Sequence, residues 1–306
     1  MKFFGKKPNI DWLKYKKAGY VFSAVLTIIT IGVIIANGGM KFGIDFAGGT
    51  LIQVKFTQQH DMHEIRATVE ATGYAGDIQQ FGEPVDVLIN VHPKGEEAGQ
   101  AANKVLDALK AKYGAAGFSV ERTEVVGPKV GKDLTYKAFM AVLYSIIGIL
   151  IYLAFRFEHR FAVTAIIALL HDTIITIGAL VITGREFSLP VLAALLTVIG
   201  YALNDRIVVF DRIRENLRVK RSLNIADLTN VSVNETLSRT MITSSLTLVS
   251  VVALFIFGGT VLKDFSFTLM VGIVFGTYSS VFVASALLID WPGITTQKLV
   301  LSILKK

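Results

Sequence analysis

Four side chains that could handle protons lie within apolar stretches of the sequence: Asp172, Asn204, Asp205 and Arg239. A charged group at the centre of a membrane helix costs at least about 2.5–3.5 kcal/mol, so such residues usually face a bundle interior and have a function. Asp205 precedes the basic residue Arg212 near the end of an apolar run. At about 1.5 Å per helical residue it lies roughly 12 Å from that end, and Arg239 lies roughly 9 Å inside the next run.

Asp205 and Arg239 are therefore expected at similar depth on consecutive antiparallel helices, where their charges could pair. Hydroxyl side chains at three- or four-residue spacing accompany both and form a polar stripe on each helix: Thr197 and Tyr201 with Asp205, and Thr243, Thr247 and Ser250 with Arg239. One interpretation is a static buried pair that fixes helix register. The other is a relay in which the carboxylate binds and releases a proton; buried pairs are often replaceable by apolar packing, which favours the relay.

Asp172 lies deeper, roughly 17 Å inside its run, with His171 beside it. This pair could join a proton relay. A cap at a helix kink is the alternative for Asp172, and the sequence does not decide between them.

The elements that must hold these residues are apolar runs. The 306-residue chain is 52% hydrophobic, with a mean hydropathy of +0.55, too apolar for a soluble protein. Several runs approach or exceed the roughly 18 residues that span a bilayer. They predict six membrane spans: Tyr20–Ala36, Leu134–Phe155, Phe161–Thr183, Leu189–Phe210, Val233–Phe257 and Phe265–Ile289.

The positive charges indicate the orientation. The net charge is +7, but lysine and arginine gather at the ends of alternate runs, which is the pattern of a topology signal rather than of a nucleic-acid surface. The first run has no cleavage site after it and is predicted to remain as an anchor. We expect a cytoplasmic N-terminus (1–19), a first span (20–36), an extracytoplasmic head (37–132), five further spans (133–290) and a cytoplasmic tail (291–306).

The head has its own periodicity. Alternating strands are expected at Thr50–Phe56, Asp77–Phe81, Val85–Val91 and Phe118–Val126, and helices at Asp61–Ala71 and Glu96–Tyr113. This βαββαβ order predicts a ferredoxin-like α+β domain. The chain is thus predicted to be an α-helical membrane protein with six spans and an inserted ferredoxin-like domain.

Other patterns carry less information. Glycines near both ends of the head permit large backbone changes and are candidate hinges: Gly38, Gly39, Gly43, Gly127 and Gly131. The small residues Gly272, Gly276, Ser280 and Ala284 predict close helix packing. The chain has no cysteine. His60 and His63 have no third ligand, which predicts solvated residues at a helix start rather than a metal site. The sequence has no phosphate-binding loop and no nucleophile constellation, so we also expect no cofactor and no enzyme activity.

Three motifs together resemble those of SecF proteins in the SecD/SecF family of the resistance-nodulation-division (RND) superfamily. They are Gly43-Ile-Asp-Phe-Ala-Gly-Gly49, the Asn204-Asp205 pair followed by Val208–Asn216, and Asn234–Thr240 followed by Thr243-Ser-Ser245. The resemblance covers nearly the whole chain. One position departs from the family: Arg206 stands where a small polar residue such as threonine is more common. Arg206 could reach the membrane surface, or pair with Asp172 or Glu235.

The resemblance implies an RND-type bundle in a bacterial cytoplasmic (inner) membrane. It also implies a heterodimer with SecD, association with the SecYEG translocon and YajC, and an unfolded preprotein as substrate. Such proteins use the proton-motive force to promote late translocation, and residues matching Asp205 and Arg239 are implicated in proton passage. Two alternatives remain: a proton-coupled small-molecule transporter on the same fold, which the single short insertion disfavours, and a passive assembly factor whose charges are structural.

Overall fold

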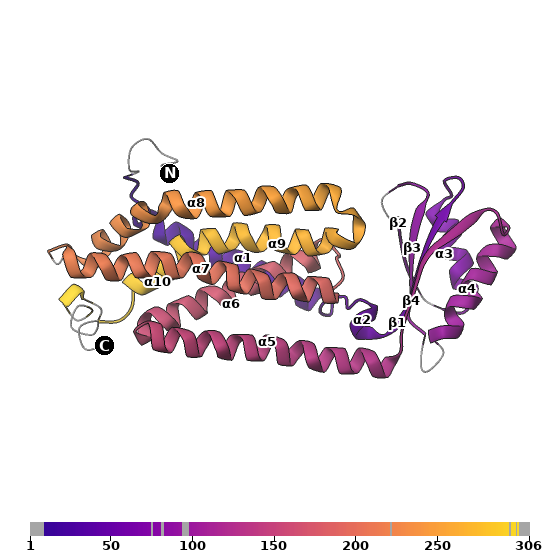
Figure 1. Cartoon of the computed structure of the whole chain (residues 1–306), viewed down its shortest axis with the longest axis horizontal. Helices are drawn as coiled ribbons and strands as arrows, with labels where there is room; N and C mark the ends of the chain where they lie inside the picture. The colour runs from indigo at the N-terminus through magenta and orange to yellow at the C-terminus, as the bar shows by residue number, and fades with distance from the viewer. Residues whose placement is uncertain are drawn as a thin grey trace. The chain divides into compact units, whose positions relative to one another are not determined.

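The computed structural model describes residues 9–74, 76–80, 83–93, 98–220, 222–293, 295–297 and 299. The chain divides into two compact units (Figure 1). The bundle unit comprises Met1–Met40, Val142–Arg185 and Pro190–Lys306, and the sheet unit comprises Lys41–Ala141 with Glu186–Leu189. The chain therefore passes between the units at four points. The basic residues Lys6 and Lys7, the turn residue Gly82 and part of the expected tail lie outside the described residues.

The described part of the sheet unit contains a four-stranded antiparallel sheet, with a helix after the first strand and another after the third. Its strands run in the order β2-β3-β1-β4, which confirms the predicted βαββαβ arrangement. The elements are β1 (Gly49–Phe56), α3 (Met62–Glu70), β2 (Gly76–Gln80), β3 (Asp86–Val91), α4 (Ala98–Tyr113) and β4 (Phe118–Val126), preceded by the short helix α2 (Ile44–Ala47). The sequence pattern did not predict α2.

The core of the sheet unit follows from strand alternation. Ile52, Val54 and Phe56 of β1 point to one face and are buried in one apolar cluster with Ile65 of α3 and Val105 of α4. Figure 1 shows α3 and α4 on the same side of the sheet. The helices thus cover one face of the sheet, as in other α+β layers.

Six helical segments of the described chain are long and apolar enough to cross a membrane, as predicted. They comprise α1 (Lys16–Ala36), α5 (Pro128–Arg156), α6 (His159–Ile182), α7 (Leu189–Val219), α8 (Ile225–Phe257) and the α9 segment. The last consists of α9 (Gly259–Ser279), a π-helical stretch at Ser280–Ser285 and α10 (Ala286–Ile289).

Three helices form the centre of the bundle. In α6, α7 and the α9 segment, 44%, 56% and 61% of the most apolar window is buried, against 17%, 11% and 17% in α1, α5 and α8. Close packing explains part of this burial: a Cβ on Gly276 would lie 2.9 Å from the Cβ of Ala202, and one on Gly272 would overlap Val198. The predicted close approach is thus confirmed for these two glycines.

Helices α7 and α8 extend beyond their apolar runs by two turns or more. Polar bonds join the extensions: Asn216 Nδ2 donates to Ser232 Oγ at 2.8 Å, and Glu235 accepts bonds from Arg212 Nε at 2.7 Å and Lys220 Nζ at 3.0 Å. Hydropathy identifies only the apolar part of a helix, so these turns could not be placed from the runs alone.

A buried glycine between α1 and α6 provides a test of this packing. A Cβ on Gly178 would overlap the side chain of Thr30, whereas Gly148 in α5 has nothing within 4 Å of its Cβ position. We expect Gly178→Ala to destabilise the protein by about 1–3 kcal/mol because it overpacks the helix contact. Gly148→Ala should be neutral or stabilising. Free energies of unfolding in detergent would show the difference, and equal values for the two variants would contradict it.

Candidate functional site

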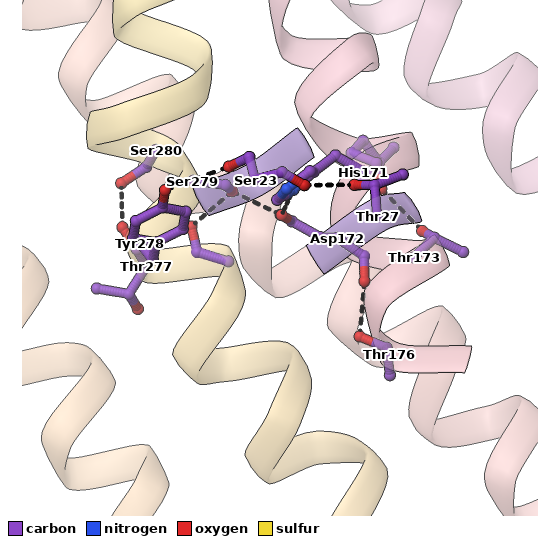
Figure 2. Close-up of polar contacts among 12 residues, drawn as sticks. Ser23, Thr27, His171, Asp172, Thr173, Thr176, Thr277, Tyr278, Ser279 and Ser280 are labelled. Carbon is purple, nitrogen blue, oxygen red and sulfur yellow. Dashed lines mark hydrogen bonds and ion pairs between the residues drawn. The ribbon is translucent and has the colours of Figure 1, made fainter. Parts of the chain in front are cut away.

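The centre of the bundle holds a buried ion pair between Asp172 of α6 and Arg206 of α7. The Arg206 side chain is fully buried, and its Nη2 pairs with Asp172 Oδ2. The same nitrogen donates to Ser279 Oγ of α9 at 2.7 Å, and Ser279 Oγ donates to Asp172 Oδ2 at 2.7 Å. Figure 2 shows Asp172 and Ser279 facing each other from the two helices. One closed set of contacts therefore joins the three central helices.

This pair decides two alternatives that the sequence left open. Arg206 takes Asp172 as its partner, one of the three possibilities considered. Asp172 lies within the uninterrupted helix α6 and does not cap a kink. Its other oxygen, Oδ1, lies 3.0 Å from His171 Nδ1, so both carboxylate oxygens have partners.

Asp205 lies in a different environment. Its side chain is buried, and Oδ2 accepts a bond from Ser244 Oγ at 3.3 Å. Ser244 Oγ in turn accepts from Thr277 Oγ1 at 2.9 Å and from the Tyr201 hydroxyl at 3.4 Å. Asp205 makes no ion pair with any residue that the structure describes. Its bonded neighbour is the neutral hydroxyl of Ser244 on α8. Ser244 is in turn bonded to the hydroxyls of Thr277 on α9 and of Tyr201 on α7.

The expected ion pair between Asp205 and Arg239 is not formed within the described residues, which corrects the sequence-based geometry. Helix rotation gives the reason. Ser244 faces Asp205, and Arg239 precedes it by five residues, so the two side chains point roughly 140° apart around α8. Arg239 is exposed instead.

The predicted polar stripe on α8 is also bonded differently. The hydroxyls of Thr243, Thr247 and Ser250 donate to carbonyl oxygens of their own helix, at 3.1, 2.9 and 3.1 Å. Such bonds back to the preceding turn are common for hydroxyl residues in helices. The side of α8 that contacts Asp205 lies one residue further along, at Ser244.

Arg239 and Asn204 line the same cleft, which has a volume of about 590 Å³. Thr236 and four charged residues form the rest of its polar wall: Asp211, Arg212, Glu215 and Glu235. The cleft thus extends from the charged ends of α7 and α8 to the residue next to Asp205. Of the four predicted site residues, Asn204 and Arg239 line this cleft together. The other two lie elsewhere: Asp172 pairs with Arg206, and Asp205 is buried against Ser244.

Three residues at the site were not predicted: Ser244, Thr277 and Ser279. The polar stripe predicted on α8 contained Thr243, the neighbour of Ser244, instead of Ser244 itself. Ser279 directly precedes the π-helical stretch, whose extra residue per turn changes the direction of later side chains. Such stretches occur frequently at functional sites, but no simple sequence pattern marks this one.

The five predicted hinge glycines fall into two groups. Gly38 and Gly39 have φ of 71° and 111° and end α1 beside the boundary between the units, where only glycine is unstrained. Gly127 has open space at its Cβ position. Gly131, inside α5, is instead close-packed: a Cβ there would lie 2.9 Å from the carbonyl oxygen of Phe46, whereas a Cβ on Gly43 would make only ordinary contacts at 3.4 Å or more. Packing explains Gly131, and a hinge stays a prediction for the other four.

The fold and the site define a multi-pass membrane protein whose central helices carry two buried carboxylates in contrasting environments. Family models agree with this class. Residues 105–293 match the model described as "Protein export membrane protein SecD/SecF, C-terminal", and residues 33–59 match "SecD/SecF GG Motif".

Individual relatives match almost end to end. The SecF translocase subunit of Calditerrivibrio nitroreducens is 49% identical over 91% of this chain and 93% of its own length, and that of Pseudomonas aeruginosa is 39% identical over 95% and 94%. The crystal structure of Thermus SecDF, described as a translocon-associated membrane protein, matches with 37% identity and a TM-score of 0.85. The match covers 95% of this chain but 40% of that longer chain.

The chain belongs to the SecD/SecF family, and within it to the SecF subunits of the protein translocase. It is accordingly a transport protein rather than an enzyme.

The buried pair yields a stability prediction. Arg206→Met leaves the Asp172 carboxylate buried without its counter-charge, so we expect a loss of about 3–5 kcal/mol in the free energy of unfolding. The double variant Asp172→Leu/Arg206→Met removes both charges and should recover most of that loss. Unfolding titrations in detergent would measure both. A double variant as unstable as the single one would show that the charges do not act as a pair.

Proposed function

We propose that this SecF subunit uses proton entry at Asp205 to promote the late passage of preproteins across the membrane, together with SecD and the SecYEG translocon. The supporting observation is the contrast between the two buried carboxylates. Asp172 is neutralised by Arg206, whereas Asp205 contacts a neutral hydroxyl. An ionised buried carboxylate without a counter-charge is costly, so a proton is its simplest partner.

Arg239 is the proposed counter-charge for the deprotonated state. It lines the cleft that reaches Asn204, directly before Asp205 in α7. When Asp205 loses its proton, attraction to Arg239 would favour a different arrangement of α7 and α8. A proton can drive work only through such a difference in affinity between two states.

The cleft is the proposed route by which the proton exchanges with water. Its volume of about 590 Å³ is ample for several waters, and charged side chains line it. Asn204, at its inner end, is placed to bond a water next to Asp205. The described contacts of the second predicted carboxylate, Asp172, suit a structural role rather than a place on this route.

The proposed location is the bacterial cytoplasmic membrane, with both termini cytoplasmic and the sheet unit outside. Positive charge supports this orientation because cytoplasmic ends of spans carry an excess of lysine and arginine. Arg156, Arg212, Arg214 and Arg218 lie at one set of helix ends. At the opposite ends, Arg185 lies in the short connection from α6 to α7, Lys263 lies in the first turns of α9, and the first turns of α5 hold Lys129 and Lys132 next to the long inserted segment. The proposed partners are SecD, SecYEG, YajC, the lipid bilayer and an unfolded preprotein.

The first test removes the titrating group. Asp205→Asn keeps the size and a hydrogen-bond acceptor for Ser244 but cannot exchange a proton. We expect it to abolish the stimulation of preprotein translocation by an imposed proton gradient in proteoliposomes that contain the whole translocase. Asp227→Asn, in the exposed first turn of α8 and outside the cleft, is the matched control and should retain stimulation. Normal stimulation of Asp205→Asn at equal incorporation would refute the proposal.

The orientation can be tested with single cysteines because the chain has none of its own. Gln58 in the sheet unit and Ser222 between α7 and α8 are both exposed. A cysteine at Gln58 should react with an impermeant thiol reagent added to intact spheroplasts, and a cysteine at Ser222 should react only after lysis. The reverse pattern would invert the proposed topology.

A further inference from the structure

The loop between α6 and α7 is built into the sheet unit by backbone bonds. Phe187 N donates to the Lys41 carbonyl at 2.7 Å, and Gly43 N donates to the Phe187 carbonyl at 3.0 Å. Phe42 and Phe187 thereby form a parallel β-bridge. Residues 186–189 accordingly cluster with residues 41–141 and not with the helices that the loop connects.

A side chain of the same segment caps the start of α7. Asp45 Oδ2 accepts a hydrogen bond from Leu189 N at 2.9 Å, and Leu189 is the first residue of α7. The first amide groups of a helix have no partner within it, and a carboxylate there also complements the helix dipole. The cap is unusual because the carboxylate comes from a residue distant in sequence.

Side-chain contacts reinforce this connection. The ring centroids of Phe42, Phe46 and Phe187 are 5.6–6.1 Å apart. Asn90 Nδ2 of β3 donates to Glu186 Oε1 at 3.0 Å. The loop is thus bound both to the 41–49 segment and to the sheet.

Glycines let the 41–49 segment pack closely enough to make these bonds. A Cβ on Gly49 would lie 2.7 Å from the Val91 carbonyl oxygen, and Gly49 has φ of 150°. Gly48, with φ of 73°, lies beside Pro128 at the start of α5. The paired glycines therefore fix the segment between β3 and α5.

We propose that residues 41–49 and 186–189 form a permanent joint in which Asp45 holds Leu189, the first residue of the helix that carries Asp205. We infer that proton-driven translocation requires this joint to stay closed, with Asp45 as its positioning residue. This inference rests on the function proposed above.

The test compares the two capping aspartates of the sheet unit. Asp61 caps α3 by accepting from His63 N at 2.9 Å, and α3 lies wholly within that unit. We expect Asp45→Ala to lower proton-gradient stimulation of translocation about fivefold, the ratio that corresponds to loss of a typical N-cap bond. Asp61→Ala loses an equivalent cap and should retain stimulation. Asp45→Asn, whose side chain can still accept from Leu189 N, should also retain most of it.

A disulfide across the joint provides a second test, because closing it would not change stimulation if Asp45 had only a structural role. Bridged residues such as Phe42 and Phe187 are close enough for a disulfide, which needs Cα atoms about 4.4–6.8 Å apart. Phe42→Cys/Phe187→Cys should restore stimulation to Asp45→Ala when oxidised and lose it again on reduction. In protein that retains Asp45, the same oxidised disulfide should leave stimulation unchanged because the joint stays closed throughout translocation.

The outcomes separate the two proposals. If Asp205→Asn loses stimulation but Asp45→Ala keeps it, the joint is refuted and the proton site stands. If the disulfide abolishes stimulation in protein that retains Asp45, the joint must open during translocation and the inference is likewise overturned. If Asp205→Asn itself retains stimulation, the proposed function fails independently of the joint.

Discussion

The ion pair between Asp172 and Arg206 is the interaction around which the bundle is organised. A guanidinium with no solvent exposure needs a fixed counter-charge, which Asp172 supplies at Nη2 together with a hydrogen bond to Ser279. Its Nε and Nη1 have no hydrogen-bond partner among the described residues. Asp172, Arg206 and Ser279 come from α6, α7 and α9, which are also the most buried of the six spanning segments. The pair therefore constrains the relative rotation and depth of three helices.

The same pair determines the chemistry available to Asp205. Arg206 is adjacent to Asp205 in sequence, yet its side chain is committed to Asp172 on a different side of α7. Among the residues that the structure describes, the hydrogen bond to the Asp205 carboxylate comes from Ser244. The two buried carboxylates of the bundle thus differ in their partners: Asp172 has a guanidinium and Asp205 has a hydroxyl.

Much of the fold could be predicted because its signals are periodic. Apolar runs located the six spans, and alternation located all four strands in their correct order. The end of α7 and the start of α8 could not be placed because polar bonds, such as that between Asn216 and Ser232, stabilise the last turns of α7 and the first turns of α8. At the site, the sequence identified Asp205 but gave it the wrong neighbour. Depth along a helix can be counted from residue number, whereas the facing direction of Arg239 depends on how α8 is rotated in the bundle.

The four chain crossings between the units have a consequence for how the protein can be divided. A domain inserted in one loop can be exchanged as one continuous piece, since the chain enters and leaves it once. Here residues 186–189 belong to the sheet unit although they connect two helices of the bundle. A chimera that replaces residues 41–141 alone would leave Phe187 and Glu186 facing foreign partners. Sequence changes in the 41–49 segment and in the 186–189 loop should therefore be inherited together among relatives.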